Sequence, residues 1–339
     1  MKKHLLIVTP ILMVALSLLP EKLFFVVKAD TSIHEVLEKL GDNSLKHTVN
    51  WNIEGVSVAK GEQLVHTGFT LNTKGKSVKK QSAHFVCTSC HNVVRDEPNL
   101  ALIDVDAKLD YAAANNIPFL QGTALYGAVN RTSFYNGDYF LKYGDLVRPA
   151  RHNIREAIQL CATECAQGRP LEDWELESIL AYLWTIDLKV HDLQLTEVER
   201  QIIEETFDTN RNKENAIKLL KSKYLSGAPA TFQKPPKDRE EGYTATGNAE
   251  NGKHVYELSC KHCHAEERYS FFNLDDSQHT FDFLAKHIAG YTQYSIYQVS
   301  RYGTSPVPGK RAYMPHYTKE KMSNQQLEDL RAYIESMAK

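Results

Sequence analysis

Apolar residues recur at helical spacing along several stretches of this chain. In the first stretch, one face of a predicted helix carries Ile33, Val36, Leu37 and Leu40. Ser32 and Glu35 form a capping-box pattern at its start, and Gly41 follows the last apolar position. We therefore expect a short amphipathic helix between Ser32 and Gly41.

Two further helical patterns lie in the middle of the chain. The first aligns on one face Ile154, Ala157, Ile158, Cys161 and Cys165. Gly168 and Pro170 follow it and are typical of a helix end. The second pattern has an apolar stripe that consists of Trp174, Ile179, Leu180, Leu183 and Trp184. Both patterns predict helices that bury one face.

The chain from residue 191 to 245 combines helical and helix-breaking signals. Glu197–Phe207 and Glu214–Tyr224 have helical spacing, and the stretch after them contains Gly227 and the pair Pro235-Pro236. A closing amphipathic helix then presents Leu327, Leu330, Tyr333 and Ile334. These patterns predict a mainly α fold in which residues 191–245 form a partly helical connector.

The first 29 residues have the pattern of a signal peptide. Basic residues at positions 2–4 precede an apolar run over 5–19, and small residues precede a plausible cleavage site after Ala29. A membrane anchor is the competing interpretation, but residues 20–22 interrupt the apolar sequence before it is long enough for a comfortable span. We expect an exported, periplasmic protein that retains no stable membrane span after cleavage.

Two short segments share the pattern Cys-x-x-Cys-His. They are Cys87-Thr88-Ser89-Cys90-His91 and Cys260-Lys261-His262-Cys263-His264. In this pattern the two thiols form thioethers with a c-type haem, and the histidine is placed to bind the iron. We therefore expect two covalently attached haem c groups, held by Cys87, Cys90 and His91 and by Cys260, Cys263 and His264. One zinc ion shared by both cysteine pairs is the alternative, but it leaves the histidine after each pair unexplained.

Length and charge fit this interpretation. The 339 residues exceed one haem module and fit two with a connector. We expect a first cytochrome c domain over 30–190, with an N-terminal extension, and a second over 246–339. The 40 Lys and Arg residues against 42 Asp and Glu residues give a net charge of −2, so nothing indicates nucleic acid as a partner.

Each iron needs a second ligand, for which methionine is the usual residue. Met314 lies in the step Tyr313-Met314-Pro315 just before the closing helix, and we expect it to be the ligand in the second domain. Met322 and Met337 are the alternatives, although their positions near or within that helix are more typical of packing residues.

The first domain has to use a different ligand, because no methionine occurs between Met13 and Met314. Cys161 and Cys165 are the only cysteines outside the haem motifs, and a metal-bound thiolate would explain why an exported protein keeps them. His152, shortly before their helix, is a third candidate. Packing alone is the remaining role for the two thiols.

The segment around Cys161 resembles the distal-cysteine helix of the dihaem thiosulfate dehydrogenase family. In that family the cysteine precedes a glycine by seven residues, and a basic residue and a leucine follow. The corresponding residues here are Cys161, Gly168, Arg169 and Leu171. The lead-in to the first motif through Gly61 and Leu64, and the order of the two modules, are also similar. The resemblance implies that Cys161, rather than Cys165, binds the first iron.

The resemblance also implies an activity, the joining of two thiosulfate ions into tetrathionate or the reverse, with Cys161 as the reactive ligand. In the family we expect a basic residue about one turn before this cysteine, where this chain has Ala157. Arg151 and Arg155 are the candidates to face an anionic substrate instead, together with Arg148.

The ligands predict a direction of electron flow. An anionic thiolate lowers the potential of the first haem and a thioether raises that of the second, so electrons should pass from the first to the second. The broad hypothesis is therefore a carrier between redox partner proteins. The narrower one is a thiosulfate dehydrogenase or tetrathionate reductase that binds a small sulfur oxyanion. A dihaem peroxidase is a third hypothesis, and it would need an acid–base residue for which only His152 is a candidate.

Overall fold

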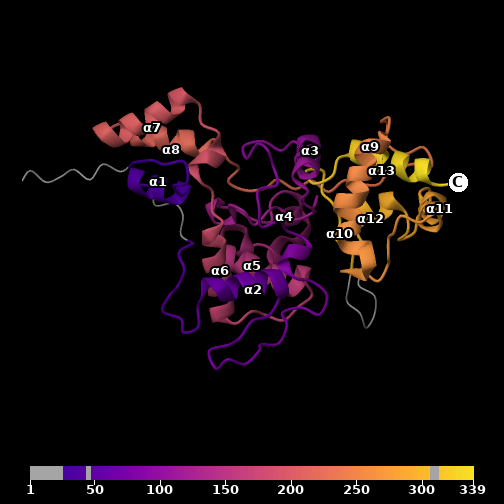
Figure 1. Cartoon of the computed structure of the whole chain (residues 1–339), viewed down its shortest axis with the longest axis horizontal. Helices are drawn as coiled ribbons and strands as arrows, with labels where there is room; N and C mark the ends of the chain where they lie inside the picture. The colour runs from indigo at the N-terminus through magenta and orange to yellow at the C-terminus, as the bar shows by residue number, and fades with distance from the viewer. Residues whose placement is uncertain (1–25, 43–46, 306–312) are drawn as a thin grey trace, which may run out of the picture.

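The computed structural model describes residues 26–42, 47–305 and 313–339, so most of the expected signal peptide lies outside the described residues. The fold is mainly α, as the sequence predicts. Within the described ranges β pairing is limited to two isolated bridges, and no helix there has the length and apolar character needed to cross a membrane. Figure 1 shows the helices in three groups along the molecule.

The first group contains the helices around the first Cys-x-x-Cys-His segment. It consists of α2 (Val58–Thr67), α4 (Asp138–Tyr143), α5 (Ile154–Leu160) and α6 (Asp173–Thr185). Its core is built from apolar residues of α2 and α6, among them Leu64, Val65, Ile179, Leu180 and Leu183. The predicted stripe on α6 is confirmed at Ile179, Leu180 and Leu183, while Trp174 and Trp184 are half-buried.

The second group brings the start of the described chain against the connector. It consists of α1 (Ile33–Leu40), α7 (Glu197–Thr209) and α8 (Lys213–Lys221), which share one apolar core. The expected ends of α1 are confirmed: the Ser32 side chain accepts a hydrogen bond from the Glu35 amide, and Gly41 takes a left-handed conformation with φ of 95°. α7 and α8 lie in the two ranges of the connector where the spacing predicts helices.

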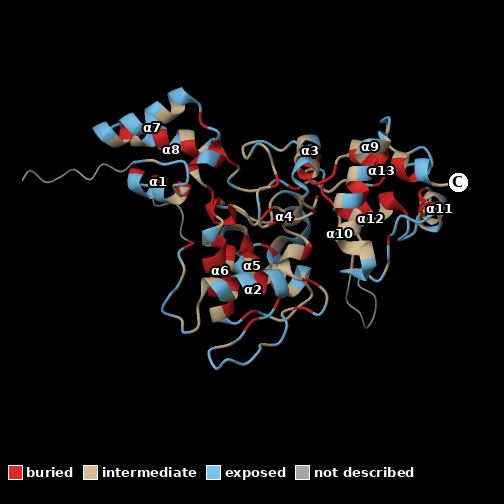
Figure 2. Ribbon diagram, viewed as in Figure 1, coloured by how far each residue is buried: buried red, intermediate tan, exposed pale blue. Residues whose placement is uncertain are grey.

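The third group surrounds the second Cys-x-x-Cys-His segment. It consists of α9 (Ala249–Val255), α10 (Lys261–His264), α11 (Gln278–His287), α12 (Ile296–Tyr302) and α13 (Asn324–Met337). α3 (Val105–Asn115) comes from the range expected for the first domain, but its Leu109 and Ala112 lie in the core of this group. Figure 2 shows the buried residues concentrated where α9 and α13 meet and along α6.

Short helical turns complete the fold. The 3-10 turns are η1 (Cys87–Ser89), η2 (Ala128–Asn130), η3 (Gly144–Leu146), η4 (Pro149–His152), η6 (Val190–Leu193) and η8 (Ala265–Glu267). Two turns are π-helical, η5 (Cys161–Cys165) directly after α5 and η7 (Tyr256–Cys260) directly after α9. Such wide turns occur often at functional sites, and both of these hold cysteines.

The first and third groups repeat one helix crossing. On α2, a Cβ added at Gly61 would lie 1.8 Å from the carbonyl oxygen of Ser178 on α6. On α9, a Cβ added at Gly252 would lie 1.9 Å from the carbonyl oxygen of Asp329 on α13. Only glycine permits backbones to approach this closely, so it fixes where each pair of helices crosses.

The same two crossings are also held by equivalent hydrogen bonds. The amide of Ser57, four residues before Gly61, donates to Ser178 Oγ at 3.1 Å. The amide of Asn248, four residues before Gly252, donates to Asp329 Oδ1 at 2.8 Å. The chain therefore contains two units with the same internal construction, each closed by its own C-terminal helix. The first unit is built around the crossing of α2 and α6, and the second unit is built around the crossing of α9 and α13.

Candidate functional site

The histidines of the two Cys-x-x-Cys-His segments are held in the same way. Nδ1 of His91 donates to the carbonyl of Thr123 at 2.7 Å, and Nδ1 of His264 donates to the carbonyl of Phe272 at 2.7 Å. Across the described ranges, Nε2 of neither ring has a hydrogen-bond partner. A backbone acceptor on Nδ1 fixes the tautomer whose Nε2 lone pair is free, which is the arrangement of a metal-binding histidine.

The loop that holds His91 depends on a glycine that the sequence pattern does not reveal. The amide of Gly122 donates to the carbonyl of Cys90 at 2.9 Å. A Cβ at this position would lie 2.3 Å from that carbonyl oxygen and 2.6 Å from Nδ1 of His91. Gly122 therefore lets Thr123 reach the ring.

The four cysteines of the two segments are half-buried. Burial raises the pKa of Cys87 and of Cys263 to about 11 and that of Cys260 to about 12. It also raises the pKa of Cys90, to which nearby Cys263 contributes. As free cysteines all four would stay protonated at neutral pH, and they would act as small apolar groups.

The two segments touch each other. Cys263 Sγ lies 3.9 Å from the carbonyl oxygen of Ser89, which is inside the first segment. Burial lowers the pKa of His262, while the nearby backbone of Thr88 and Ser89 opposes that shift. In the described part of the chain, no group of three or more His, Cys, Asp or Glu side chains could together hold a metal ion. The two cysteine pairs thus meet without forming a shared zinc site.

Cys161 and Cys165 form the next part of the site. The η5 turn is closed by a bond from the Ala166 amide to the carbonyl of Cys161 at 2.8 Å, five residues back. Within it the neighbouring Cys165 thiol raises the pKa of Cys161, and Cys161 lowers that of Cys165. Cys87 and Cys90 lie close enough to raise the pKa of Cys161 further. The turn therefore faces the first Cys-x-x-Cys-His segment.

His152 lies elsewhere. Its ring is exposed, and Nδ1 donates to the carbonyl of Thr132 at 3.0 Å. No contact between described residues joins it to Cys87, Cys90 or His91. The structure brings the two cysteines, rather than His152, toward the first segment.

The three arginines that precede the cysteines have different surroundings. Arg155 donates through Nε and Nη2 to both carboxylate oxygens of Glu177 and to the carbonyl of Thr48. Arg148 pairs with Asp145 at the surface. Arg151 lies 4.3 Å from the centre of the Phe140 ring, and its buried Nε has no hydrogen-bond partner among the described residues. Of the three, Arg151 is the arginine whose buried Nε lacks a partner among the described residues.

Met314 is half-buried against the core of the third group. Its amide donates to Thr304 Oγ1 at 2.8 Å, and its carbonyl accepts from the Thr304 amide at 2.9 Å. Met322 is fully buried in the same core, whereas Met337 is largely exposed. Their surroundings are those of a packing residue and a surface residue.

Three tyrosines also surround the cysteine turn, and the sequence gives no signal for them. The hydroxyl of Tyr135 lies 3.9 Å from Cys165 Sγ, and that of Tyr313 donates to the carbonyl of Cys165 at 2.8 Å. The Tyr139 ring stacks on His316, with ring centres 5.9 Å apart. Burial raises the pKa of all three phenols, and Cys161 and Cys165 raise each of them further. Tyr313 and His316 come from the chain of the second unit.

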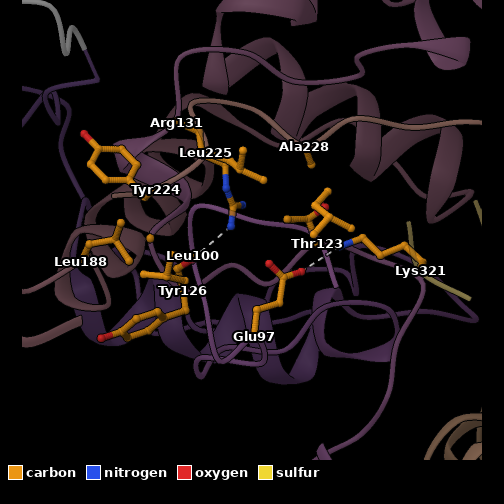
Figure 3. A pocket seen from close by; sticks show the side chains of 12 residues that line it. Glu97, Leu100, Thr123, Tyr126, Arg131, Leu188, Tyr224, Leu225, Ala228 and Lys321 are labelled. Atoms are coloured by element: carbon orange, nitrogen blue, oxygen red, sulfur yellow. Dashed lines mark hydrogen bonds and ion pairs between the residues drawn. The ribbon is translucent and has the colours of Figure 1, made fainter. Parts of the chain in front are cut away.

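A pocket behind His91 gathers buried charges from both units. Lys321 of the second unit and Arg131 and Glu97 of the first line it together with Thr123, the residue whose carbonyl holds His91. Figure 3 shows Glu97 and Lys321 facing each other across this pocket, and their charged atoms lie 3.5 Å apart. Burial lowers the pKa of His91, and the positive charges of Lys321 and Arg131 lower it further.

Comparison of the chain with protein family models, with curated proteins and with solved structures gave no match.

Proposed function

We propose that this chain is an exported dihaem c-type cytochrome that carries out electron transfer. The observation that supports it best is the matched state of His91 and His264, each with Nδ1 committed to a backbone carbonyl and Nε2 without a partner among the described residues. Each histidine directly follows a Cys-x-x-Cys pair, and each pair lies in a unit with the same glycine-based helix crossing.

The residues fit two haem groups. Cys87 and Cys90, with His91, would hold the first, and Cys260 and Cys263, with His264, would hold the second. Protonated thiols that belong to no group of three or more His, Cys, Asp or Glu side chains able to hold a metal ion, among the described residues, suit thioether formation better than a zinc site. When bound, each haem would supply a one-electron redox centre.

The second ligands would make the two centres unequal. The cysteine turn would supply the first centre with a thiolate, for which the resemblance to thiosulfate dehydrogenases selects Cys161. Met314 would supply the second with a thioether. Because a thiolate lowers the potential and a thioether raises it, electrons would pass from the first centre to the second and then to a partner protein.

Covalent haem content tests this proposal directly. The chain, expressed with its leader in a host that makes c-type cytochromes, is expected to bind two haems per polypeptide in the alkaline pyridine assay. The substitution pair Cys87→Ser and Cys90→Ser should leave one haem, as should Cys260→Ser and Cys263→Ser. A preparation with intact, helical protein and no covalent haem would contradict the proposal.

Thiosulfate dehydrogenase or tetrathionate reductase activity at the first centre is the second candidate. It is favoured by the paired thiols of Cys161 and Cys165 and by Arg151, whose buried Nε has no partner within the described residues. The holoprotein, incubated with thiosulfate and an artificial electron acceptor, is then expected to reduce the acceptor, and Arg151→Ala should raise KM more than it lowers kcat. No turnover across a broad pH range would exclude the enzyme and leave the carrier.

A further inference from the structure

The end of the cysteine turn needs partners for its backbone. The last carbonyls of a helix have no amide within the helix to accept from, so they take other donors or water. At η5 the Ala162 carbonyl accepts from the Gln81 side chain at 2.6 Å, and the Ala166 carbonyl accepts from Ser82 Oγ at 2.6 Å. Both donors belong to the first unit.

The carbonyl of Cys165 is different, because its donor comes from the second unit. Tyr313 reaches across and donates its hydroxyl to this carbonyl at 2.8 Å. Its ring packs edge-on against Phe85, just before the first Cys-x-x-Cys-His segment, with ring centres 5.8 Å apart. Phe85 is buried, so Tyr313 is held on two sides by the first unit.

Tyr313 is also the residue directly before Met314. The Met314 backbone is fixed in both directions by Thr304, through its hydroxyl and its amide. Gly303 allows this close approach, since a Cβ there would lie 2.3 Å from the Met314 carbonyl oxygen. Two consecutive residues, with the backbone of the second fixed by hydrogen bonds, therefore have different partners. Tyr313 donates to the cysteine turn of the first centre, and Met314 is the expected ligand of the second centre.

We propose that Tyr313 is a positioning residue that couples the two distal ligands, so that a change in the attachment of Met314 alters the placement of the Cys161–Cys165 turn. This inference rests on the proposed function. Movement of Met314 away from its ligand position shifts the preceding residue, and the Tyr313 hydroxyl then pulls on or releases the last carbonyl of the turn. The link is mechanical and acts through one hydrogen bond.

A double-mutant cycle separates this link from the electrostatic effect of one centre on the other. The holoprotein is prepared as wild type, Met314→Ala, Tyr313→Phe and the double variant, and the paramagnetic resonance signal and midpoint potential of the thiolate-ligated centre are measured in each. The electrostatic influence of the second centre on the first is the same with Tyr or Phe at position 313. The difference between the effect of Met314→Ala in these two backgrounds therefore reports only the coupling through the Tyr313 hydroxyl.

We expect Met314→Ala to shift the first centre when Tyr313 is present and to shift it by less than roughly half as much in the Tyr313→Phe background. Thr304→Val removes the hydroxyl that accepts from the Met314 amide, and it should also reduce the shift that Met314→Ala causes at the first centre. Tyr243→Phe is the matched control, since the Tyr243 hydroxyl donates to the Lys234 carbonyl at 2.6 Å, accepts from Arg301 and has no contact with the cysteine turn among the described residues. It is expected to behave as wild type.

Equal shifts in both backgrounds, with two haems bound and normal helical content, would overturn the inference alone. Chains without covalent haem would instead contradict the proposed function and this inference with it. Haem content is measured on every variant first, so the two failures are distinguished.

Discussion

The two thiols of the η5 turn differ in chemical state although they belong to the same residue type. The neighbouring Cys165 raises the pKa of Cys161, and Cys161 lowers the pKa of Cys165. Cys165 is therefore the sulfur that loses its proton more readily in the chain alone. A metal bound to Cys161 would have to displace the proton of that thiol, with Cys165 as its neighbour.

Single substitutions of Cys161 and of Cys165 should distinguish the roles of the two thiols. With Cys161 as the ligand of the first centre, Cys161→Gly is expected to abolish the low-spin thiolate signal in electron paramagnetic resonance. Cys165→Ser keeps a hydrogen-bond donor and should keep the signal with shifted g values. The reverse result, with the signal retained in Cys161→Gly and lost in Cys165→Ser, would assign the ligand to Cys165.

At this scale the sequence indicates which residues are chemically special but not how they are held. The Cys-x-x-Cys-His pattern identifies His91, because the motif itself is local in sequence. The acceptor Thr123 and the close approach of Gly122 lie about thirty residues away and depend on a loop path that no local pattern encodes. Tyr313 is hidden for the same reason, since its partner Cys165 belongs to the other unit.

Helices and their ends follow closely from periodicity and caps. α1 lies between its caps Ser32 and Gly41, and α7 begins at Glu197, as the sequence predicts. The helix expected to continue through Cys165 widens into the η5 turn from Cys161 onward. Apolar spacing cannot reveal this change, because residues four apart share a face in an α-helix and remain neighbours in one wide turn.

The glycine crossings give a prediction for the helix pairs. Gly61→Ala places a methyl group where the Ser178 carbonyl oxygen lies, so α2 and α6 must separate. The expected cost is at least about 1–3 kcal/mol of unfolding free energy, typical of overpacking, and chemical denaturation measures it. Glu62→Ala, at the next and exposed position of α2, is the control and should change stability by less than about 0.5 kcal/mol. Equal stability of Gly61→Ala and wild type would contradict the crossing.

Charged residues, as well as apolar contacts, join the first and third helix groups. Lys321 of the second unit is buried in the pocket behind His91, where its neighbours are Glu97, Asp96, Lys108 and Arg131. Lys108 pairs with Asp96 at 2.9 Å. The carboxylate that pairs with Lys321 is that of Glu97, at the longer distance of 3.5 Å. Burial therefore lowers the pKa of Lys321 to about 8.

This depressed pKa predicts how stability changes with pH. Between about pH 8 and the unperturbed lysine pKa of 10.5, the unfolded chain binds a proton at Lys321 that the folded chain does not, so this residue makes stability rise with pH. The full effect is on the order of 3 kcal/mol at most. Denaturation from pH 7.5 to 10 should show wild type gaining stability relative to Lys321→Met. Lys319→Met, at an exposed position, should follow wild type, and parallel curves for Lys321→Met would disprove the assignment.

The arrangement of whole units is the part that sequence patterns leave open. Mainly α architecture follows from periodicity, but α3 packs in the core around α9 and α13 although it precedes them by more than a hundred residues. Its Leu109 and Ala112 would fit the core of either unit by hydrophobicity. Shape complementarity between distant elements decides between them, and it has no one-dimensional signature.

The contact between Cys263 and Ser89 sets an order of events in the life of the protein. Once the two units are docked, the two Cys-x-x-Cys-His segments touch each other, and their cysteines are half-buried. On the proposed function, the machinery that forms the four thioether bonds must work on an open chain. Docking is then the last step of maturation, and a chain that closes early would be left permanently empty at the segment it hides.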